Sequence, residues 1–173
     1  MKITKVVLAL LTVGFLGIQF IRPELNVQQR DPGKSIFDMF PASDTLHKLL
    51  TVACLDCHSD STRYPWYALI QPSMWFLSNH IHDGKRNLNF DEYATYRPFR
   101  QFGKLVQIER QLTEGEMPLS SYLLIHRDAV LSQEQKEMII AWSKALRDSL
   151  RARYPPDSLE RRRNGREREG GRM

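Results

Sequence analysis

Apolar residues form one long uninterrupted run near the start of the chain. Lys2 and Lys5 precede it, and the run extends over residues 6–21 without a charge. A basic start before an apolar core is typical of an export signal, although a transmembrane helix usually needs about 20 residues. We interpret residues 1–22 as an uncleaved signal anchor, with the lysines in the cytoplasm and the rest of the chain on the periplasmic side of the inner membrane. A cleaved signal peptide and a buried core helix are the alternatives.

Composition divides the rest of the chain into three parts. Residues 23–42 have few apolar positions and contain Pro and Gly, so we expect a linker. Residues 43–150 carry helical patterns and nearly balanced charge. Residues 151–173 hold eight Arg against four acidic residues, and this Arg-, Glu- and Gly-rich composition predicts a basic, disordered tail. The net charge of +5 therefore describes the tail and indicates no nucleic-acid partner.

Helical spacing of apolar residues recurs through residues 43–150. Ser43 is a candidate N-cap for a helix that leads into Cys54, and Ser132 with Gln135 forms a capping box before the last helix. A further helix is expected over residues 71–81, with Gly84 as its stop. Helices are also expected over residues 89–96 and 99–112. We find no strand pattern of useful length and no internal repeat. The sequence predicts an all-α domain.

The candidate chemistry lies in Cys54-Leu55-Asp56-Cys57-His58, which contains both cysteines of the chain. C-x-x-C-H is the spacing of c-type haem attachment: two thiols on one helical turn reach one edge of the macrocycle, and the adjacent His ligates iron. A thioredoxin-like redox pair needs a βαβ setting, a zinc site needs more ligands, and a structural disulfide is the remaining alternative. We predict one covalent haem c with His58 as proximal ligand.

The sixth iron ligand has two candidates. Met117 lies in a Gly-Glu-Met-Pro loop downstream of the motif, where a distal ligand is expected, although many Met residues only fill core gaps. His80 is the alternative distal ligand, and an open coordination position is a third possibility. We favour Met117.

Three aromatic residues follow the motif and are candidates for packing against the haem, since a porphyrin needs a large apolar wall. Ordinary core packing explains them equally well. They are Tyr64, Trp66 and Trp75.

Two stretches resemble a bacterial haem-binding domain family with a single C-x-x-C-H. The stretches are CLDCHSDSTRYPWYALIQPSMWFLSNHIHDGKRNLNFDEY and GEMPLSSYLLIHRDAVLSQEQKEMIIAWS. The resemblance implies a cytochrome c-like helical domain around one haem, tethered to the cell envelope. It carries over Cys54, Cys57 and His58 as attachment and ligand residues and suggests Met117 as the opposite ligand. Family members often have Met-Pro-Pro, where this chain has Met117-Pro118-Leu119.

These observations predict a membrane-anchored electron carrier rather than an enzyme. Its expected partner is a redox protein of the cell envelope. A peroxidase-like enzyme or a haem-based sensor, each with an open or exchangeable sixth position, is the alternative function.

Overall fold

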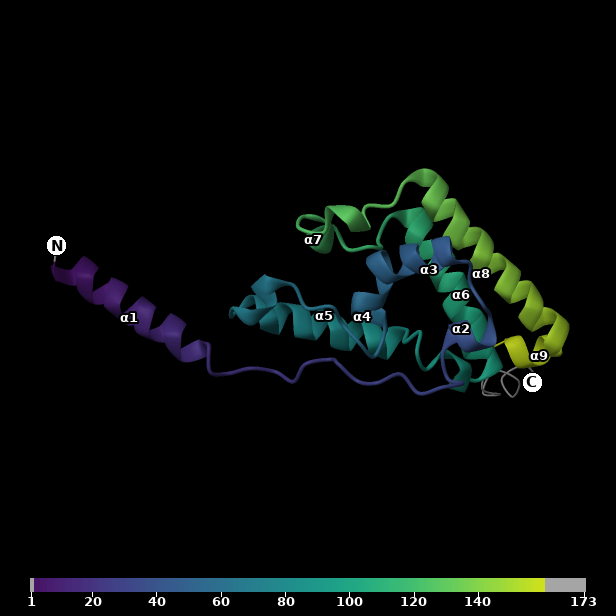
Figure 1. The fold of residues 1–173 in the computed structure, drawn as a ribbon, viewed down its shortest axis with the longest axis horizontal. Coiled ribbons are helices and arrows are strands. Elements are labelled where there is room, and N and C mark those ends of the chain that lie inside the picture. Colours follow the sequence, from purple (N-terminus) through teal and green to yellow (C-terminus); the bar gives the residue numbers. More distant parts are fainter. Residues whose placement is uncertain (1, 161–173) are drawn as a thin grey trace, which may run out of the picture.

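A computed structural model of the chain describes residues 2–160 (Figure 1). Within these residues the fold is helical and has no β-strand, apart from an isolated antiparallel bridge between Val27 and Ser61. The prediction of an all-α protein is confirmed. The elements are α1 (Lys2–Ile18), α2 (Ile36–Met39), α3 (Asp44–Leu50), the π-helix η1 (Thr51–Leu55), α4 (Asp56–His58), η2 (Trp66–Leu69), α5 (Ser73–Asn87), η3 (Tyr93–Thr95), α6 (Pro98–Glu114), α7 (Ser120–Leu123), η4 (Arg127–Ala129), α8 (Gln133–Arg153) and α9 (Pro156–Leu159).

The main core lies between α6 and α8, which run side by side, with α9 closing one end and α3 packed against α8 (Figure 1). Leu105 and Leu112 of α6 are buried there against Ile139 and Leu150 of α8. A second, smaller cluster consists of Ala68, Leu77 and Ile81, with Cys57 and Tyr64 packed against it. Burial of these apolar side chains is the principal force that holds the helices together.

Helix boundaries follow the predicted caps in two cases. The Ser43 hydroxyl accepts a hydrogen bond from the Leu46 amide at the start of α3, and Ser132 forms a capping box with Gln135 before α8. Gly115, with φ of 72°, ends α6 in the left-handed conformation that glycine adopts most readily. The prediction that Gly84 stops its helix is wrong, because α5 continues to Asn87.

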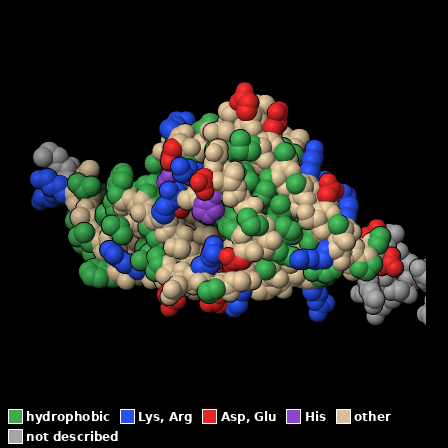
Figure 2. Space-filling view, turned by 45° about the vertical axis from the view of Figure 1, so that its right-hand side comes forward, with side chains coloured by type: hydrophobic (Ala, Val, Ile, Leu, Met, Phe, Trp, Pro, Cys, Tyr) green, Lys and Arg blue, Asp and Glu red, His purple; other side chains and the backbone are tan. Residues whose placement is uncertain are grey.

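The predicted membrane helix is not supported by the structure. In residues 2–160 we find no helix that combines the length and the apolar character needed to cross a membrane. Helix α1 has 17 residues, and at 1.5 Å per residue it is about 25 Å long, short of the roughly 30 Å hydrocarbon core. Its side chains, mostly hydrophobic, are exposed at one end of the molecule (Figure 2). The prediction of a single-pass inner-membrane protein is therefore wrong.

The segment predicted as a linker makes specific contacts with the domain. The Asn26 side chain donates to the Ser59 carbonyl and to the Thr62 hydroxyl, both at 2.9 Å, and accepts from Lys85 at 2.7 Å. Residues 36–39 of the same segment form α2, whose Ile36 is fully buried. Residues 151–160 of the predicted tail extend α8 and form α9, and residues 161–173 lie outside the described part of the chain.

Candidate functional site

The C-x-x-C-H residues lie on one continuous turn between the two apolar clusters. Cys54 belongs to the π-helix η1, and Cys57 and His58 belong to α4. A π-helical turn inside an α-helical stretch is uncommon and is often found at functional sites. Cys54 packs against the main core, whereas Cys57 packs against the smaller cluster. The turn therefore joins the two halves of the domain.

Both cysteines are free thiols. Burial, and then the nearby Cys57, raises the pKa of Cys54 to about 12. Burial, and then the charge of Asp56, raises the pKa of Cys57 to about 11. Desolvation disfavours a thiolate, so both groups are neutral at pH 7 and lack the electropositive surroundings of a reactive redox cysteine. The thioredoxin-like interpretation is therefore not supported by these surroundings.

The His58 imidazole is held by one strong contact. Its Nδ1 lies 2.8 Å from the carbonyl oxygen of Leu88, which can only accept, so Nδ1 carries the proton and the lone pair is on Nε2. Burial lowers the pKa of His58, backbone hydrogen bonds at Leu88 and Gly84 partly oppose this, and the charge of Lys104 lowers it further. The amide of Phe90 donates to the His58 carbonyl at 2.8 Å. A neutral imidazole fixed through Nδ1 is the usual state of a metal-binding histidine.

Gly84 explains how closely α5 approaches this turn. A Cβ atom placed on Gly84 would lie 2.4 Å from the carbonyl oxygen of Cys57, which is far inside ordinary contact distance. Only glycine allows the α5 backbone to lie against α4 here. This requirement for close backbone approach, and not a helix stop, accounts for glycine at this position.

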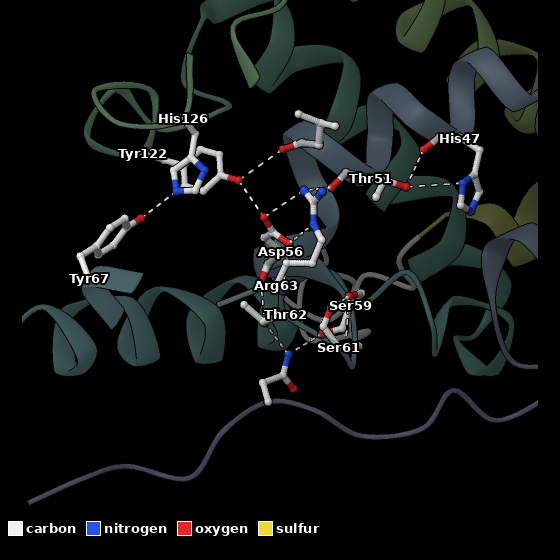
Figure 3. A network of polar contacts seen from close by, with 12 residues as sticks. His47, Thr51, Asp56, Ser59, Ser61, Thr62, Arg63, Tyr67, Tyr122 and His126 are labelled. Carbon is white, nitrogen blue, oxygen red and sulfur yellow. Dashed lines mark hydrogen bonds and ion pairs between the residues drawn. The ribbon is translucent and has the colours of Figure 1, made fainter. Parts of the chain in front are cut away.

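Asp56, between the two cysteines, is buried and is held by several groups (Figure 3). The Arg63 Nε donates to Oδ1 at 3.1 Å, and its Nη2 donates to Oδ2 at 3.2 Å. The Tyr122 hydroxyl donates to Oδ2 at 2.9 Å, and the Thr62 hydroxyl donates to the Asp56 carbonyl at 2.6 Å. The Asp56 carboxylate therefore connects the Cys54–His58 turn both to Arg63 and to Tyr122 of α7.

The same network continues to a third segment. The ring of Tyr122 stacks on His126 with centroids 4.0 Å apart, and His126 Nε2 lies 2.7 Å from the Tyr67 hydroxyl (Figure 3). Tyr67 belongs to η2, whereas Tyr122 belongs to α7. The network ties η2 and α7 to the turn that carries the motif.

Met117 lies in the loop between α6 and α7 and is half-buried. Its amide donates to the Gln111 carbonyl at 3.3 Å, which folds the loop back on the end of α6. Five residues later, Tyr122 contacts Asp56 of the motif. The chain carrying Met117 is thus tied to the Cys54–His58 turn, and the role of Met117 as distal ligand stays a prediction.

The remaining candidates lie in different surroundings. Tyr64 packs with Cys57 in the smaller cluster, and its hydroxyl accepts from the Asn26 amide at 2.7 Å. Trp66 is 75% exposed. The Trp75 indole donates to the Ile21 carbonyl at 2.9 Å, away from the cluster. His80 donates through Nδ1 to the Phe76 carbonyl of its own helix at 2.8 Å, and its ring lies against Phe76. The structure brings only Tyr64 together with a motif cysteine.

The donor set suits a covalently attached haem. Two neutral thiols lie on one turn, the neighbouring imidazole keeps Nε2 for a metal, and apolar clusters flank both cysteines. Cys54 and Cys57 would hold the macrocycle, and His58 would bind its iron. In residues 2–160 no group of three or more His, Cys, Asp and Glu side chains could hold a metal ion, which leaves the zinc interpretation without a ligand set.

Comparison with known proteins gives one match. The sequence model of a family described as a haem-binding domain matches residues 13–145. No curated protein matches the chain, and no solved structure does.

Proposed function

Because this chain belongs to the haem-binding domain family, we propose that it is a mono-haem c-type cytochrome with a cytochrome c-like arrangement of helices, and that it carries electrons. The observation that best supports the proposal is the His58 imidazole. It donates through Nδ1 to the Leu88 carbonyl at 2.8 Å, and His58 directly follows Cys57, a free thiol, in the chain. A carbonyl partner on Nδ1 leaves Nε2 as the metal-binding nitrogen and fixes the ring orientation.

The chain's own residues would perform three tasks. Cys54 and Cys57 would form the thioether bonds, which prevent loss of the cofactor. His58 would supply the proximal nitrogen, with Leu88 holding its ring. A haem held in this way supplies one-electron chemistry, with iron alternating between Fe(III) and Fe(II).

We propose Met117 as the distal ligand. Its loop is linked to the motif through the hydrogen bond between Tyr122 and Asp56, which supports a fixed distance between the loop and the motif. His80 is the alternative ligand, and its ring lies against Phe76 of the same helix. A thioether ligand raises the reduction potential relative to a second imidazole.

Electron transfer requires no side chain that acts as an acid, a base or a nucleophile. We therefore propose an electron carrier and not an enzyme. A second redox protein would be its partner.

Absorption spectra of the protein produced with a haem-attachment system test this proposal. We expect a six-coordinate low-spin spectrum in which Met117→Ala removes the weak long-wavelength band of Met-ligated ferric haem. Met138→Ala, an exposed methionine on α8, is the matched control and should leave the spectrum unchanged. Loss of the low-spin spectrum in His80→Ala alone would assign His80 instead. A five-coordinate high-spin wild type would contradict the electron-carrier proposal and favour a peroxidase-like or sensing role.

A further inference from the structure

One face of α6 borders a hollow of about 520 Å³ that contains none of the motif residues. That volume is within the range of ligand-binding pockets, so the hollow is large enough for part of a cofactor. The described residues that line it come from α6 and from the end of α9. They are Phe99, Arg100, Gly103, Lys104, Gln107 and Leu159.

The hollow borders the segment that holds His58. The Arg100 guanidinium donates to the Arg86 carbonyl at 3.4 Å, and the Leu88 carbonyl, two residues further on, holds Nδ1 of His58. Arg100 also lies over the Tyr96 ring at 4.3 Å, and the Tyr96 hydroxyl accepts from the Asn89 amide. Lys104 follows Arg100 by one turn of the same helix and lines the same hollow. The two cations and the imidazole therefore share one neighbourhood.

Arg100 and Lys104 lie one turn apart and repel each other. Within residues 2–160 neither side chain forms an ion pair, and the Lys104 ammonium donates to the Gln107 side chain at 2.8 Å. Partial burial, and then Arg100, lowers the pKa of Lys104. Two adjacent cations without an anion are unfavourable, particularly for the half-buried Lys104.

Two cations of α5, close to the Cys54–His58 turn, each have a carboxylate partner. Lys85 contacts Asp60 at 2.8 Å and Arg86 contacts Asp83 at 3.2 Å. In the described part of the chain Arg100 and Lys104 have no such carboxylate partner and line the same hollow, so the pair is suited to bind a negatively charged group there.

Gly103 keeps the hollow open between the two cations. A Cβ atom there would meet no atom within 4 Å. Glycine inside a helix costs about 1 kcal/mol relative to alanine, so a helical glycine that relieves no contact is unfavourable by itself. A larger side chain at this position would occupy the space between Arg100 and Lys104.

We propose that Arg100 and Lys104 bind a propionate carboxylate of the haem, with Gly103 leaving room for it and Gln107 orienting Lys104. This inference rests on the proposed function, because it requires haem at Cys54, Cys57 and His58. A guanidinium and an ammonium are the usual partners of carboxylates, and charge-assisted hydrogen bonds of this kind are about twice as strong as neutral ones. A free oxyanion would use the same chemistry, so the test must separate the two sources.

The test is the midpoint potential of the haem-loaded protein, measured by spectroelectrochemistry. We expect Lys104→Gln and Arg100→Gln each to lower the midpoint potential. Loss of a cation leaves the carboxylate charge uncompensated and favours the ferric state. Lys104→Arg keeps the charge and should restore most of the wild-type value. Lys144→Gln, on the exposed face of α8, removes the same charge at a distance and is the matched control.

Three results are decisive. If Lys104→Gln shifts the potential no more than Lys144→Gln does, the inference is overturned. If added inorganic phosphate shifts the wild-type potential but not that of the Lys104→Gln, Arg100→Gln double variant, the hollow binds a free anion and the propionate assignment is overturned. If the intact mass of the wild type shows no attached haem, the proposed function fails first, which distinguishes that failure from a failure of this inference.

Discussion

Replacing Gly84 with alanine tests the close approach of α5 to the motif turn. The new Cβ would lie 2.4 Å from the Cys57 carbonyl oxygen, whereas ordinary contacts begin at 3.4 Å, so the helices must separate by about 1 Å. The clashing atom belongs to the backbone and cannot rotate away. Overpacking of this kind costs typically 1–3 kcal/mol, and the higher helix propensity of alanine returns about 1 kcal/mol. We expect a net loss of up to about 2 kcal/mol in the free energy of unfolding.

Urea unfolding followed by tryptophan fluorescence measures this change. Gly103→Ala is the matched control, since Gly103 is also a helical glycine but its Cβ would meet no atom within 4 Å. We expect this control to stabilise the protein by about 0.5–1 kcal/mol. Equal stabilisation by both substitutions would refute the close contact between α5 and α4. A loss confined to Gly84→Ala would support it.

Asp56→Ala, with Asp83→Ala as its control, tests the hydrogen bonds of the buried carboxylate, and Tyr93→Phe tests the buried phenol. Asp56→Ala should lower the free energy of unfolding by about 1–3 kcal/mol, because the half-buried Tyr122 hydroxyl loses its shorter hydrogen bond and the Arg63 backbone amide loses its acceptor. The exposed Arg63 side chain contributes little. Asp83→Ala, which removes an exposed ion pair, should change it by less than about 0.5 kcal/mol, and similar losses in both variants would contradict this assignment. Burial raises the pKa of Tyr93 well above its ordinary value of 10.0, so the phenol loses its proton at lower pH in the unfolded chain than in the folded protein. The stabilisation of the folded state by the Tyr93 phenol is therefore complete below pH 10 and declines above it. Tyr93→Phe should therefore reduce the loss of unfolding free energy between about pH 10 and 11, and an unchanged alkaline slope would show that Tyr93 is not responsible.

The sequence predicted the helices whose signals are local. Ser43 caps α3 and the Ser132–Gln135 capping box begins α8, because these hydrogen bonds join residues three positions apart. The prediction that Gly84 ends its helix was wrong, because glycine also permits the close approach of two backbone segments. The segment that approaches Gly84 contains Cys57, 27 positions earlier in the chain. Local patterns contain no information on such a contact.

The candidate site was predictable only in part. The spacing of Cys54, Cys57 and His58 identified the turn, because C-x-x-C-H is a local pattern. Asp56 is one of the two positions that the C-x-x-C-H pattern leaves unspecified, yet it is buried and bonded to Tyr122, 66 residues away. No sequence pattern identified Arg100 and Lys104 as a pair, because the hollow that they line is completed by Leu159 of α9.

The membrane assignment failed for a quantitative reason. The apolar run was continuous and followed two lysines, which is the usual pattern of a signal anchor. The helix that forms from it, α1, ends at Ile18, before the length needed to cross a bilayer is reached.

The intact mass of the protein produced with a haem-attachment system tests the central claim most directly. We predict a mass increase equal to one haem in the wild type, and no increase in the Cys54→Ser, Cys57→Ser double variant, because the two thiols are the only attachment points in the sequence. His58→Ala should keep the covalent haem but change its visible spectrum. A wild type without added mass, or a double variant that retains it, would contradict covalent attachment at Cys54 and Cys57.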